Sequence, residues 1–286
     1  MLEFAHGRFD PGARPVISIH GVRKLDGDLA KVAHDMRLAR YEVAALLRPG
    51  EYQFLQVDAP NVPKEELRSA IRWKIRDMID YHVDDATVDV LDIPPPEGAG
   101  ARAHFMYAIS ARNDVIEAKI RLFEQARVPL SVIDIPETAQ RNIAALYEDD
   151  ERAVALAYFA ARWGLLTINW RRELYLARRI DVGLEQLAPG APARDAAQER
   201  VAVEIQRTLD HFDRQFGAIP VATMLIAPAP QDGGMAQHLR GRLGIEAQEL
   251  DLARALAFEE GVPEREMQWR LFHHFGASLR HETKAL

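Results

Sequence analysis

Ala153-Val-Ala-Leu-Ala-Tyr-Phe159 opens a block of three apolar runs in the second half of the sequence. It is followed by Gly164-Leu-Leu-Thr-Ile-Asn-Trp170 and then by Leu174-Tyr-Leu-Ala-Arg-Arg-Ile180. Each run has the length and the apolar content of a buried β-strand. Only Arg171, Arg172 and Glu173 separate the last two runs, which is short enough for a hairpin. The block therefore predicts three consecutive strands.

The residues after this block predict a helix and then an alternation of strands and helices. A loose stretch rich in Pro, Ala and Gly covers residues 187–197. Apolar residues then recur at spacings of three and four, which lines one face of a helix that Gly217 can end: Val201, Ile205, Leu209, Phe212 and Phe216. A strand at 221–227, a helix at 235–243, a strand at 245–250 and a helix from Pro263 complete the order βββαβαβα.

The first half fits the same template if one segment is inserted and one strand is absent. The template elements are a strand at 15–19, a helix capped by Asp28, a strand at 42–47, a helix through Ile116, Ile120 and Phe123, a strand at 128–135 and a helix that Pro136 opens. Residues 2–5 are the remnant of the second template strand. We therefore expect the first template strand to be missing, either because the sequence starts late or because the protein never had it.

The inserted segment covers about residues 51–111 and reads as a small subdomain. We expect a strand near 53–57, a helix near 63–79, strands at 87–93 and 104–110, and an exposed turn at 94–100. The apolar stripe of the helix consists of Leu67, Ile71, Ile75 and Met78. Arg68, Arg72, Arg76 and Asp77 are expected to face water.

Length and composition limit the functional class. A chain of 286 residues is long for one core, so we expect two lobes, residues 1–150 and 151–286. A net charge of -7 argues against a general nucleic-acid binder, and the absence of Cys excludes thiolate sites and disulfides. Residues 1–14 do not resemble a signal peptide, and no apolar run has the length of a membrane span. These features predict a cytoplasmic protein.

Several segments, taken in order, resemble one family. Residues 62–73, Val-Pro-Lys-Glu-Glu-Leu-Arg-Ser-Ala-Ile-Arg-Trp, run on to Asp77-Met-Ile-Asp80 and resemble a helix of the PilM-like pilus-assembly proteins. Residues 133–137 with Arg141 and Asn142, residues 174–179, and residues 275–280 resemble further segments of that family. The chain looks most similar to the MshI type, which takes part in biogenesis of the MSHA pilus. The resemblance extends from about Leu25 to Arg280.

The resemblance implies an α/β, two-lobed, actin-like (ribonuclease H-like) fold. It also implies a cytoplasmic scaffold of a type IV (MSHA-type) pilus assembly platform, peripheral at the inner membrane through its partners. Such a scaffold binds the cytoplasmic tail of an inner-membrane protein of the PilN type, in a groove bordered by the inserted subdomain. The assembly ATPase is a further partner that the resemblance suggests. The alternative is an ATP-binding switch of the same machinery.

Nucleotide binding can be tested on three loops, because actin-like ATPases hold phosphate with turns of small residues whose N–H groups approach the ligand. The strand that carries the first turn is the missing one. The second turn is Ala160-Ala161-Arg162-Trp163-Gly164, in which only Gly164 is of the expected kind. After 221–227, Pro228-Ala-Pro230 stands where paired glycines are expected, and proline removes an N–H donor. We therefore expect no cofactor and no catalytic activity. If ATP with Mg binds, Gly164, Gly276 and Ser278 are its candidate residues.

Four residues are candidates for partner binding: Trp73, Arg162, Arg178 and Arg179. Trp73 lies beside the apolar stripe of its helix, where packing into the core is the more ordinary interpretation. Arg162 with Trp163 forms either a binding turn or an exposed corner with a packed tryptophan, and the latter is favoured. The arginine pairs at 171–172 and 178–179 fit either an acidic partner or lipid, or a solvated strand edge.

No catalytic motif or metal site is expected from the sequence. His273, His274 and His281 lack the spacing of a helical metal site, so a structural role is favoured. Asp84 with Asp85 and Asp149 with Asp150 fit surface turns. A third, more general interpretation is a two-domain α/β enzyme of unknown class. Such an enzyme would have a pocket that holds titratable groups with strongly perturbed pKa values.

Overall fold

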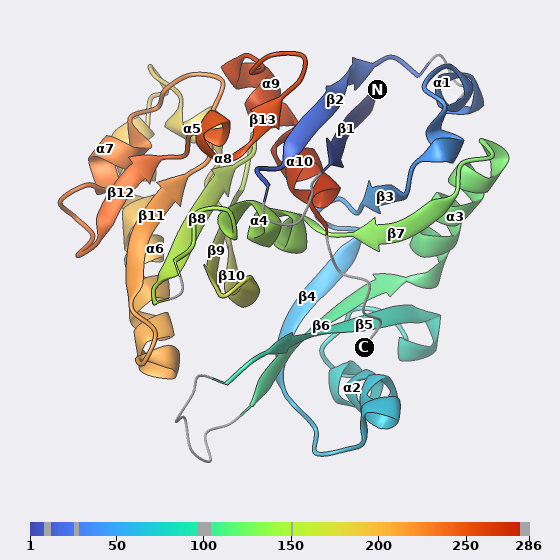
Figure 1. Ribbon diagram of the computed structural model, residues 1–286. Helices are drawn as coiled ribbons and strands as arrows, with labels where there is room; N and C mark the ends of the chain where they lie inside the picture. Colours follow the sequence, from blue (N-terminus) through green and yellow to red (C-terminus); the bar gives the residue numbers. More distant parts are fainter. Residues whose placement is uncertain (9–12, 26–28, 96–103, 150, 281–286) are drawn as a thin grey trace. The chain divides into compact units, whose positions relative to one another are not determined.

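The computed structural model describes residues 1–8, 13–25, 29–95, 104–149 and 151–280 (Figure 1). The chain forms two compact units. The first unit holds Met1 and Lys24–Pro136, and the second unit holds Leu2–Arg23 together with Glu137–Arg280. These units are defined by packing and not by the repeat of strand order, so the lobe boundary at residue 150 stays a prediction.

A five-stranded sheet forms the centre of the second unit. Its strands are β8 (Ala153–Phe159), β9 (Gly164–Trp170), β10 (Glu173–Ile180), β11 (Val221–Ile226) and β12 (Glu246–Glu249). Their order is β10-β9-β8-β11-β12, antiparallel up to β8 and parallel beyond it. Every residue of β8 and β9 is buried, as expected for continuous apolar runs in a sheet covered on both faces. The three predicted strands are confirmed.

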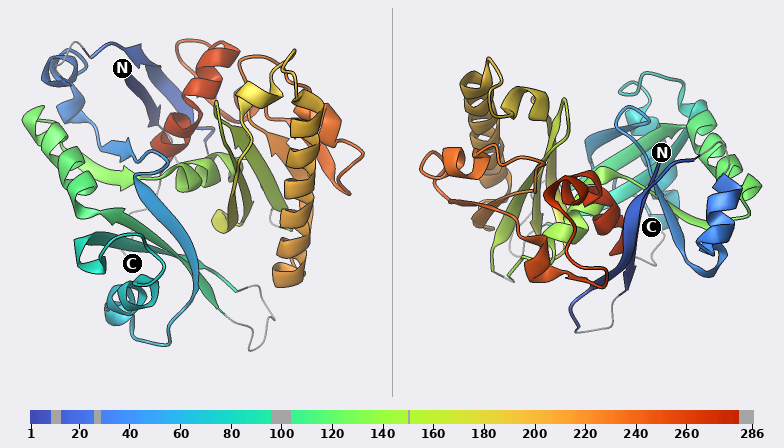
Figure 2. Two further views of the ribbon diagram at one scale, coloured as in Figure 1. Left: turned by 180° about the vertical axis from the view of Figure 1, so that it is seen from behind. Right: turned by 90° about the horizontal axis from the view of Figure 1, so that it is seen from above.

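Helices cover both faces of this sheet (Figure 2). The rings of Phe212 and Phe216 in α6 (Arg194–Phe216) pack against Tyr175 of β10. Leu156 and Tyr158 of β8 share a core with residues of α4 (Pro136–Ala144) and α10 (Phe272–Ser278). The remaining helices of this unit are α5 (Leu184–Leu187), α7 (Met235–Leu239), α8 (Leu252–Ala255) and α9 (Arg265–Arg270).

Two helix boundaries in the second unit differ from the sequence-based expectation. Helix α6 begins at Arg194, inside the stretch that was predicted to be loose. The side chains of Arg194 and Gln198 both donate to the carbonyl oxygen of Gly233, which fixes the first turns of this helix. Helix α7 ends at Leu239, before the expected 243, because Arg240 is extended and Gly241 adopts a positive φ of 97°.

A small sheet in the second unit contains the N-terminal strands. Strand β1 (Leu2–Arg8) pairs antiparallel with β2 (Val16–Arg23), and β13 (Ala257–Phe258) lies parallel to β2 on its other side. The sequence did not predict β13, which has two residues. Within the described residues, two strands precede the first helix, where the second half has three.

The first unit begins with α1 (Leu29–Asp35) and contains β3 (Val43–Leu46) paired parallel with β7 (Leu130–Asp134). Helix α3 (Asn113–Gln125) precedes β7. These elements confirm the predicted order, whereas the proposed cap Asp28 lies outside the described residues.

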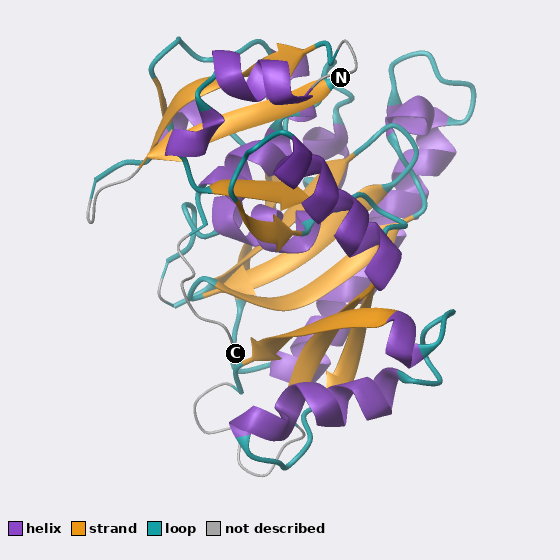
Figure 3. Ribbon diagram, turned by 90° about the vertical axis from the view of Figure 1, so that its right-hand side faces the viewer, coloured by secondary structure: helices purple, strands orange, loops and turns teal. Residues whose placement is uncertain are grey.

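The inserted subdomain is a three-stranded antiparallel sheet with one helix (Figure 3). Its elements are β4 (Tyr52–Asp58), α2 (Leu67–Ile75), β5 (Ala86–Ile93) and β6 (Phe105–Arg112), with strand order β4-β6-β5. Ile71 and Ile75 of α2 are fully buried against this sheet. Most of the turn expected at 94–100 lies outside the described residues.

The end of α2 corrects one expectation. The helix was predicted to run to residue 79 and to bury Met78. It ends at Ile75, because the Met78 N–H bonds the Ile75 carbonyl at 2.8 Å in a tighter turn, and the side chain of Met78 is exposed.

Candidate functional site

The turn between β8 and β9 is the second of the turns that the sequence suggests as a phosphate site. The Ala160 N–H bonds the Trp163 carbonyl at 2.8 Å and closes the turn. The carbonyls of Ala160 and Ala161 accept from the N–H groups of Leu184 and Glu185, at 2.8 and 2.9 Å. Phosphate binding needs N–H groups that point at the ligand. Here it is the carbonyl groups of the turn that engage the neighbouring segment.

Three residues of this turn have structural explanations. A Cβ added at Gly164 would lie 2.7 Å from Cδ1 of Phe159, so the glycine is needed for packing. The side chain of Arg162 is 83% exposed and pairs with Glu185, with Nε and Oε1 3.3 Å apart. Trp163 is half-buried and packs against the core of the second unit. The turn is thus an exposed corner with a packed tryptophan, and Arg162 stays a candidate for partner binding.

The loop after β11 is held by side chains from two helices. Gly233 O accepts from Nη2 of Arg194 at 2.5 Å and from Nε2 of Gln198 at 2.9 Å. Nε of Arg265 donates to the Ala229 carbonyl at 3.2 Å. The loop in which paired glycines were expected after β11 is therefore bound to the protein's own helices.

Gly276 and Ser278, the other candidate nucleotide residues, lie in α10. A Cβ at Gly276 would lie 2.0 Å from the carbonyl oxygen of Ala139, so this glycine lets α10 approach the backbone of α4. Oγ of Ser278 donates to the Phe275 carbonyl at 2.8 Å, a bond within the helix. Both residues thus have a role in packing.

The arginines of β10 point to opposite sides of the strand. Arg178 lies 3.7 Å from Oε2 of Glu204 on α6. Arg179 lies 3.8 Å from Oδ1 of Asp181, and its guanidinium carbon is 5.4 Å from the ring centre of Trp163. The structure therefore brings Arg179 and Arg162 to the same hairpin corner and directs Arg178 elsewhere. The side chain of Arg179 is exposed.

Trp73 on α2 is 71% exposed, so the favoured core interpretation is wrong. Ile71 and Ile75 of the apolar stripe already fill the core of the subdomain. Trp73 therefore lies on the side of α2 that faces away from this core. The guanidinium carbon of Arg76 is 5.3 Å from the ring centre of Trp73. An exposed tryptophan that is flanked by a cation is the kind of side chain that anchors a protein interface.

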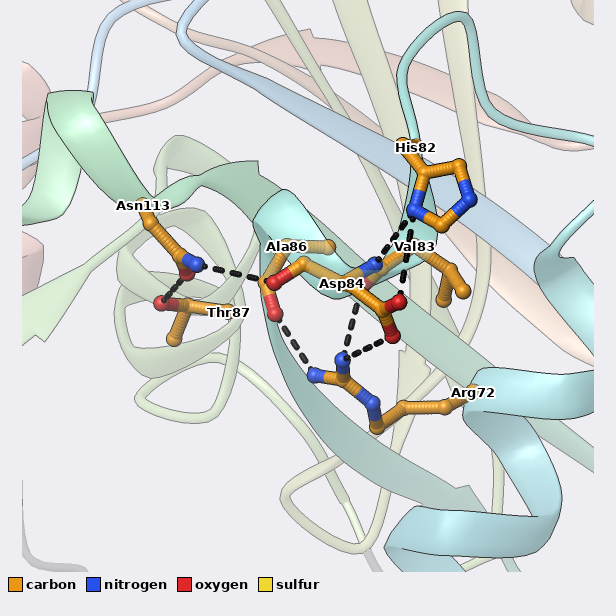
Figure 4. A network of polar contacts seen from close by, with 7 residues as sticks. All are labelled: Arg72, His82, Val83, Asp84, Ala86, Thr87 and Asn113. Carbon is orange, nitrogen blue, oxygen red and sulfur yellow. Dashed lines mark hydrogen bonds and ion pairs between the residues drawn. The ribbon is translucent and has the colours of Figure 1, made fainter.

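Arg72 holds α2 in place, a role that sequence reasoning missed (Figure 4). Its Nη1 donates to the Ala86 carbonyl and its Nη2 to the Val83 carbonyl, both at 2.6 Å. Nη2 also lies 3.9 Å from Oδ1 of Asp84. Asn113 binds the same segment, because its Nδ2 donates to the Asp84 carbonyl at 3.2 Å. The helix that presents Trp73 is therefore fixed to the sheet edge by polar contacts as well as by its apolar stripe.

A buried polar group in the second unit was also missed. Nε2 of Gln140 donates to the Leu156 carbonyl at 2.7 Å and to Oγ1 of Thr167 at 3.1 Å. Nε2 of His273 lies 3.3 Å from Oε1 of Gln140, and the imidazole contacts Tyr158. Burial and the charge of His274 lower the pKa of His273 to about 3, so it is neutral near pH 7. This agrees with a structural role for His273, while His281 lies outside the described residues.

The described residues contain neither a group of three metal-ligating side chains nor a helix that is long and apolar enough to cross a membrane.

Comparison with solved structures gives matches over nearly the whole chain. No family model and no curated protein matches it. The chain is similar to a structure described as a PilM-PilN type IV pilus biogenesis complex. The TM-score is 0.68 and the identity 16%, covering 97% of this chain and 93% of that one.

Two further structures match with lower scores. The cytoplasmic domain of EpsL, an inner-membrane component of the type II secretion system of Vibrio cholerae, has a TM-score of 0.45 and 11% identity, covering 96% of this chain and 94% of that one. A Bacteroides thetaiotaomicron protein with an actin-like ATPase fold and unknown function has a TM-score of 0.47 and 8% identity, covering 94% and 95%. The chain has the two-lobed actin-like fold that its sequence predicted.

Proposed function

We propose that this protein is a cytoplasmic platform component of a type IV pilus assembly machine, peripheral at the inner membrane. In this proposal it binds the cytoplasmic tail of an inner-membrane protein of the PilN kind. The observation that carries the proposal is the match over 97% of the chain to the PilM-PilN complex, at a TM-score of 0.68. The sequence resemblance to MshI-type proteins supports a place in the MSHA pilus, with the assembly ATPase as a second partner.

We propose further that the protein acts by binding and does not hydrolyse ATP. The carbonyl-engaged turn at Ala160 and the loop bound at Gly233 support this part of the proposal. Gly164 and Gly276 are explained by packing, so their presence does not require a nucleotide.

Trp73 is the side chain we assign to the partner interface. It is the most exposed large apolar residue among those described, and Arg72 fixes the helix that carries it. Aromatic residues of this kind commonly supply a large share of binding energy when a partner covers them. Arg162 and Arg179 form a second candidate contact at the β8–β9 corner of the second unit.

The test is a calorimetric titration of the full chain with a synthetic peptide of the presumed partner's cytoplasmic tail. We expect a dissociation constant of about 50 μM or tighter. Trp73→Ala should weaken binding about tenfold without lowering the melting temperature, since the side chain contributes little to the core. Val262→Ala, at a residue that is 56% exposed, is the matched control and should bind normally. Absence of binding at peptide concentrations of about 50 μM would contradict the proposal.

A further inference from the structure

The side of α2 that faces away from its sheet carries a regular row of exposed residues. Glu66, Ser69, Trp73 and Arg76 are all exposed and follow one another at spacings of three, four and three residues. Glu66 is the N-cap and Arg76 the C-cap of the helix, and both have helical backbone angles. Since this spacing lines one face of a helix, the four side chains form a continuous strip, which we call the outer face of α2.

The other cations of this helix are held by the inserted subdomain itself. Arg68 and Lys74 form ion pairs with aspartates of β5 and β4, at 3.1 and 3.2 Å. The guanidinium of Arg72 donates to two carbonyls of the segment that leads into β5. The charges of the outer face are therefore Glu66 at one end and Arg76 at the other.

Arg76 is placed to bind a group that approaches the outer face. Its guanidinium carbon is 5.3 Å from the ring centre of Trp73, so the side chain lies along this face. It also contacts the next residue, Asp77, with Nε and Oδ1 3.3 Å apart. The two side chains of that pair are 50% and 85% exposed, and pairs of this kind contribute little to stability. A carboxylate of another molecule can therefore replace Asp77.

The outer face is complementary to itself. Its spacing is symmetric about the middle of the helix, so a second α2 that runs antiparallel about a two-fold axis presents the same row in reverse. Glu66 then faces Arg76 of the second copy, and Trp73 faces the small side chain of Ser69. A parallel arrangement would instead place Glu66 against Glu66 and Trp73 against Trp73. Charge and size complementarity therefore select the antiparallel arrangement.

We propose that the outer face of α2 is a self-association site, at which two copies of this chain pair their α2 helices antiparallel. The pair covers two copies of Trp73, which is 71% exposed in the single chain. One short helix from each copy gives a small interface, and interfaces of this size are typical of transient complexes. We therefore expect a concentration-dependent pair with a dissociation constant of about 100 μM. The function proposed above uses Trp73 for the tail, so a chain contacts either the tail or a second copy with this face.

The test is sedimentation equilibrium of the full chain without any peptide, at concentrations from about 10 μM to about 1 mM. The parent should show a reversible equilibrium between one and two copies. Glu66→Arg and Arg76→Glu should each raise the dissociation constant at least about tenfold, because like charges then meet at both ends of the pair. The two substitutions change the net charge of the chain in opposite directions, so a general charge effect does not weaken association in both.

Restoration by combining the two substitutions is the second arm. The double variant Glu66→Arg, Arg76→Glu should associate with a dissociation constant within about threefold of the parent's, since opposite charges face each other again. An equimolar mixture of the two single variants should also associate. Glu117→Arg on α3 makes the same charge change at a side chain that is 61% exposed, and it should leave association unchanged. Thermal melts check that every variant retains its fold.

Two results would overturn the proposal: a parent chain that stays single at about 1 mM, or a double variant that associates no better than the single variants. If Trp73→Ala then still weakens tail binding, the outer face of α2 serves the tail alone and the function proposed above stands. Normal self-association without any tail binding would contradict only the tail-binding proposal.

Discussion

The five-stranded sheet of the second unit and the small sheet of β1, β2 and β13 differ in how deeply their strands are buried. Strands β8 and β9 consist of buried residues throughout, with helices on both faces of the sheet. Strand β1 mixes Glu3 and His6 with apolar residues and remains half-buried. The comparison teaches that neighbours on both edges are not enough to bury a strand, because β2 lies between β1 and β13 and is still partly exposed. Cover on both faces is also needed, as in β8 and β9.

The largest expected change in unfolding free energy comes from replacing a leucine by alanine in each of the two sheets. Leu156 in β8 is fully buried and Leu2 in β1 is half-buried. Leu156→Ala should cost about 3 to 5 kcal/mol of unfolding free energy, because it leaves a cavity in a closed core. Leu2→Ala should cost about 1 kcal/mol or less. Urea denaturation of both variants checks this, and similar losses would contradict the comparison.

Gly276 tests how closely the helices approach in the second half. Gly276→Ala places a Cβ 2.0 Å from the Ala139 carbonyl oxygen and should cost about 3 kcal/mol, because the backbone of α4 must move. Gly244→Ala, where no atom lies within 4 Å, is the matched control. If Gly276→Ala retains full stability in thermal melts, the packing explanation for this glycine is wrong.

The acid sensitivity of the second half depends on His273. The pKa of this group is lowered by burial to about 3 in the folded chain, below the unfolded value, so the unfolded state binds the extra proton below pH 6.5. Stability should therefore fall as pH decreases from 6.5 towards 3, by about 2 kcal/mol between pH 7 and pH 5 from this residue. His273→Gln should remove that part of the loss in denaturation curves. If His273→Gln shows the same pH dependence of stability as the parent, His273 is not the source of this loss.

The smallest effect concerns the hairpin between β9 and β10. Arg171 and Arg172 have positive φ values of 49° and 65°, which are costly for residues with side chains. Replacing them by Arg171→Asn and Arg172→Gly gives the residues that this turn favours and should add about 1 kcal/mol of stability. The Arg172 N–H bond to Glu148, at 2.7 Å, involves the backbone and can persist. A melting temperature at or below that of the parent would count against strain at this turn.

Sequence reasoning succeeded where periodicity decides the outcome. The apolar runs of β8 to β10 and the spacing along α6 identified the strands and the helix, although α6 begins seven residues before Val201. Boundaries set by side-chain contacts were not predictable, because Arg194 and Gln198 recognise a carbonyl of Gly233 that is distant in sequence.

Single side chains at the candidate sites were harder to place than whole elements. The spacing left Trp73 at the margin of its stripe, and only the position of the sheet under α2 decides that it is exposed. Arg72 was expected to face water, but its guanidinium binds two carbonyls of the segment that leads into β5. Gln140 and His273 meet across 133 residues of sequence, a pairing that no local pattern indicates.

The most direct measurement of the central claim is the tail-peptide titration carried out twice, without nucleotide and with excess Mg-ATP. If the protein is a binding platform that needs no nucleotide, the two dissociation constants will agree, and the melting temperature will be the same with and without Mg-ATP. Binding that appears only with Mg-ATP, together with a rise in melting temperature, would contradict the account and establish a nucleotide-dependent switch.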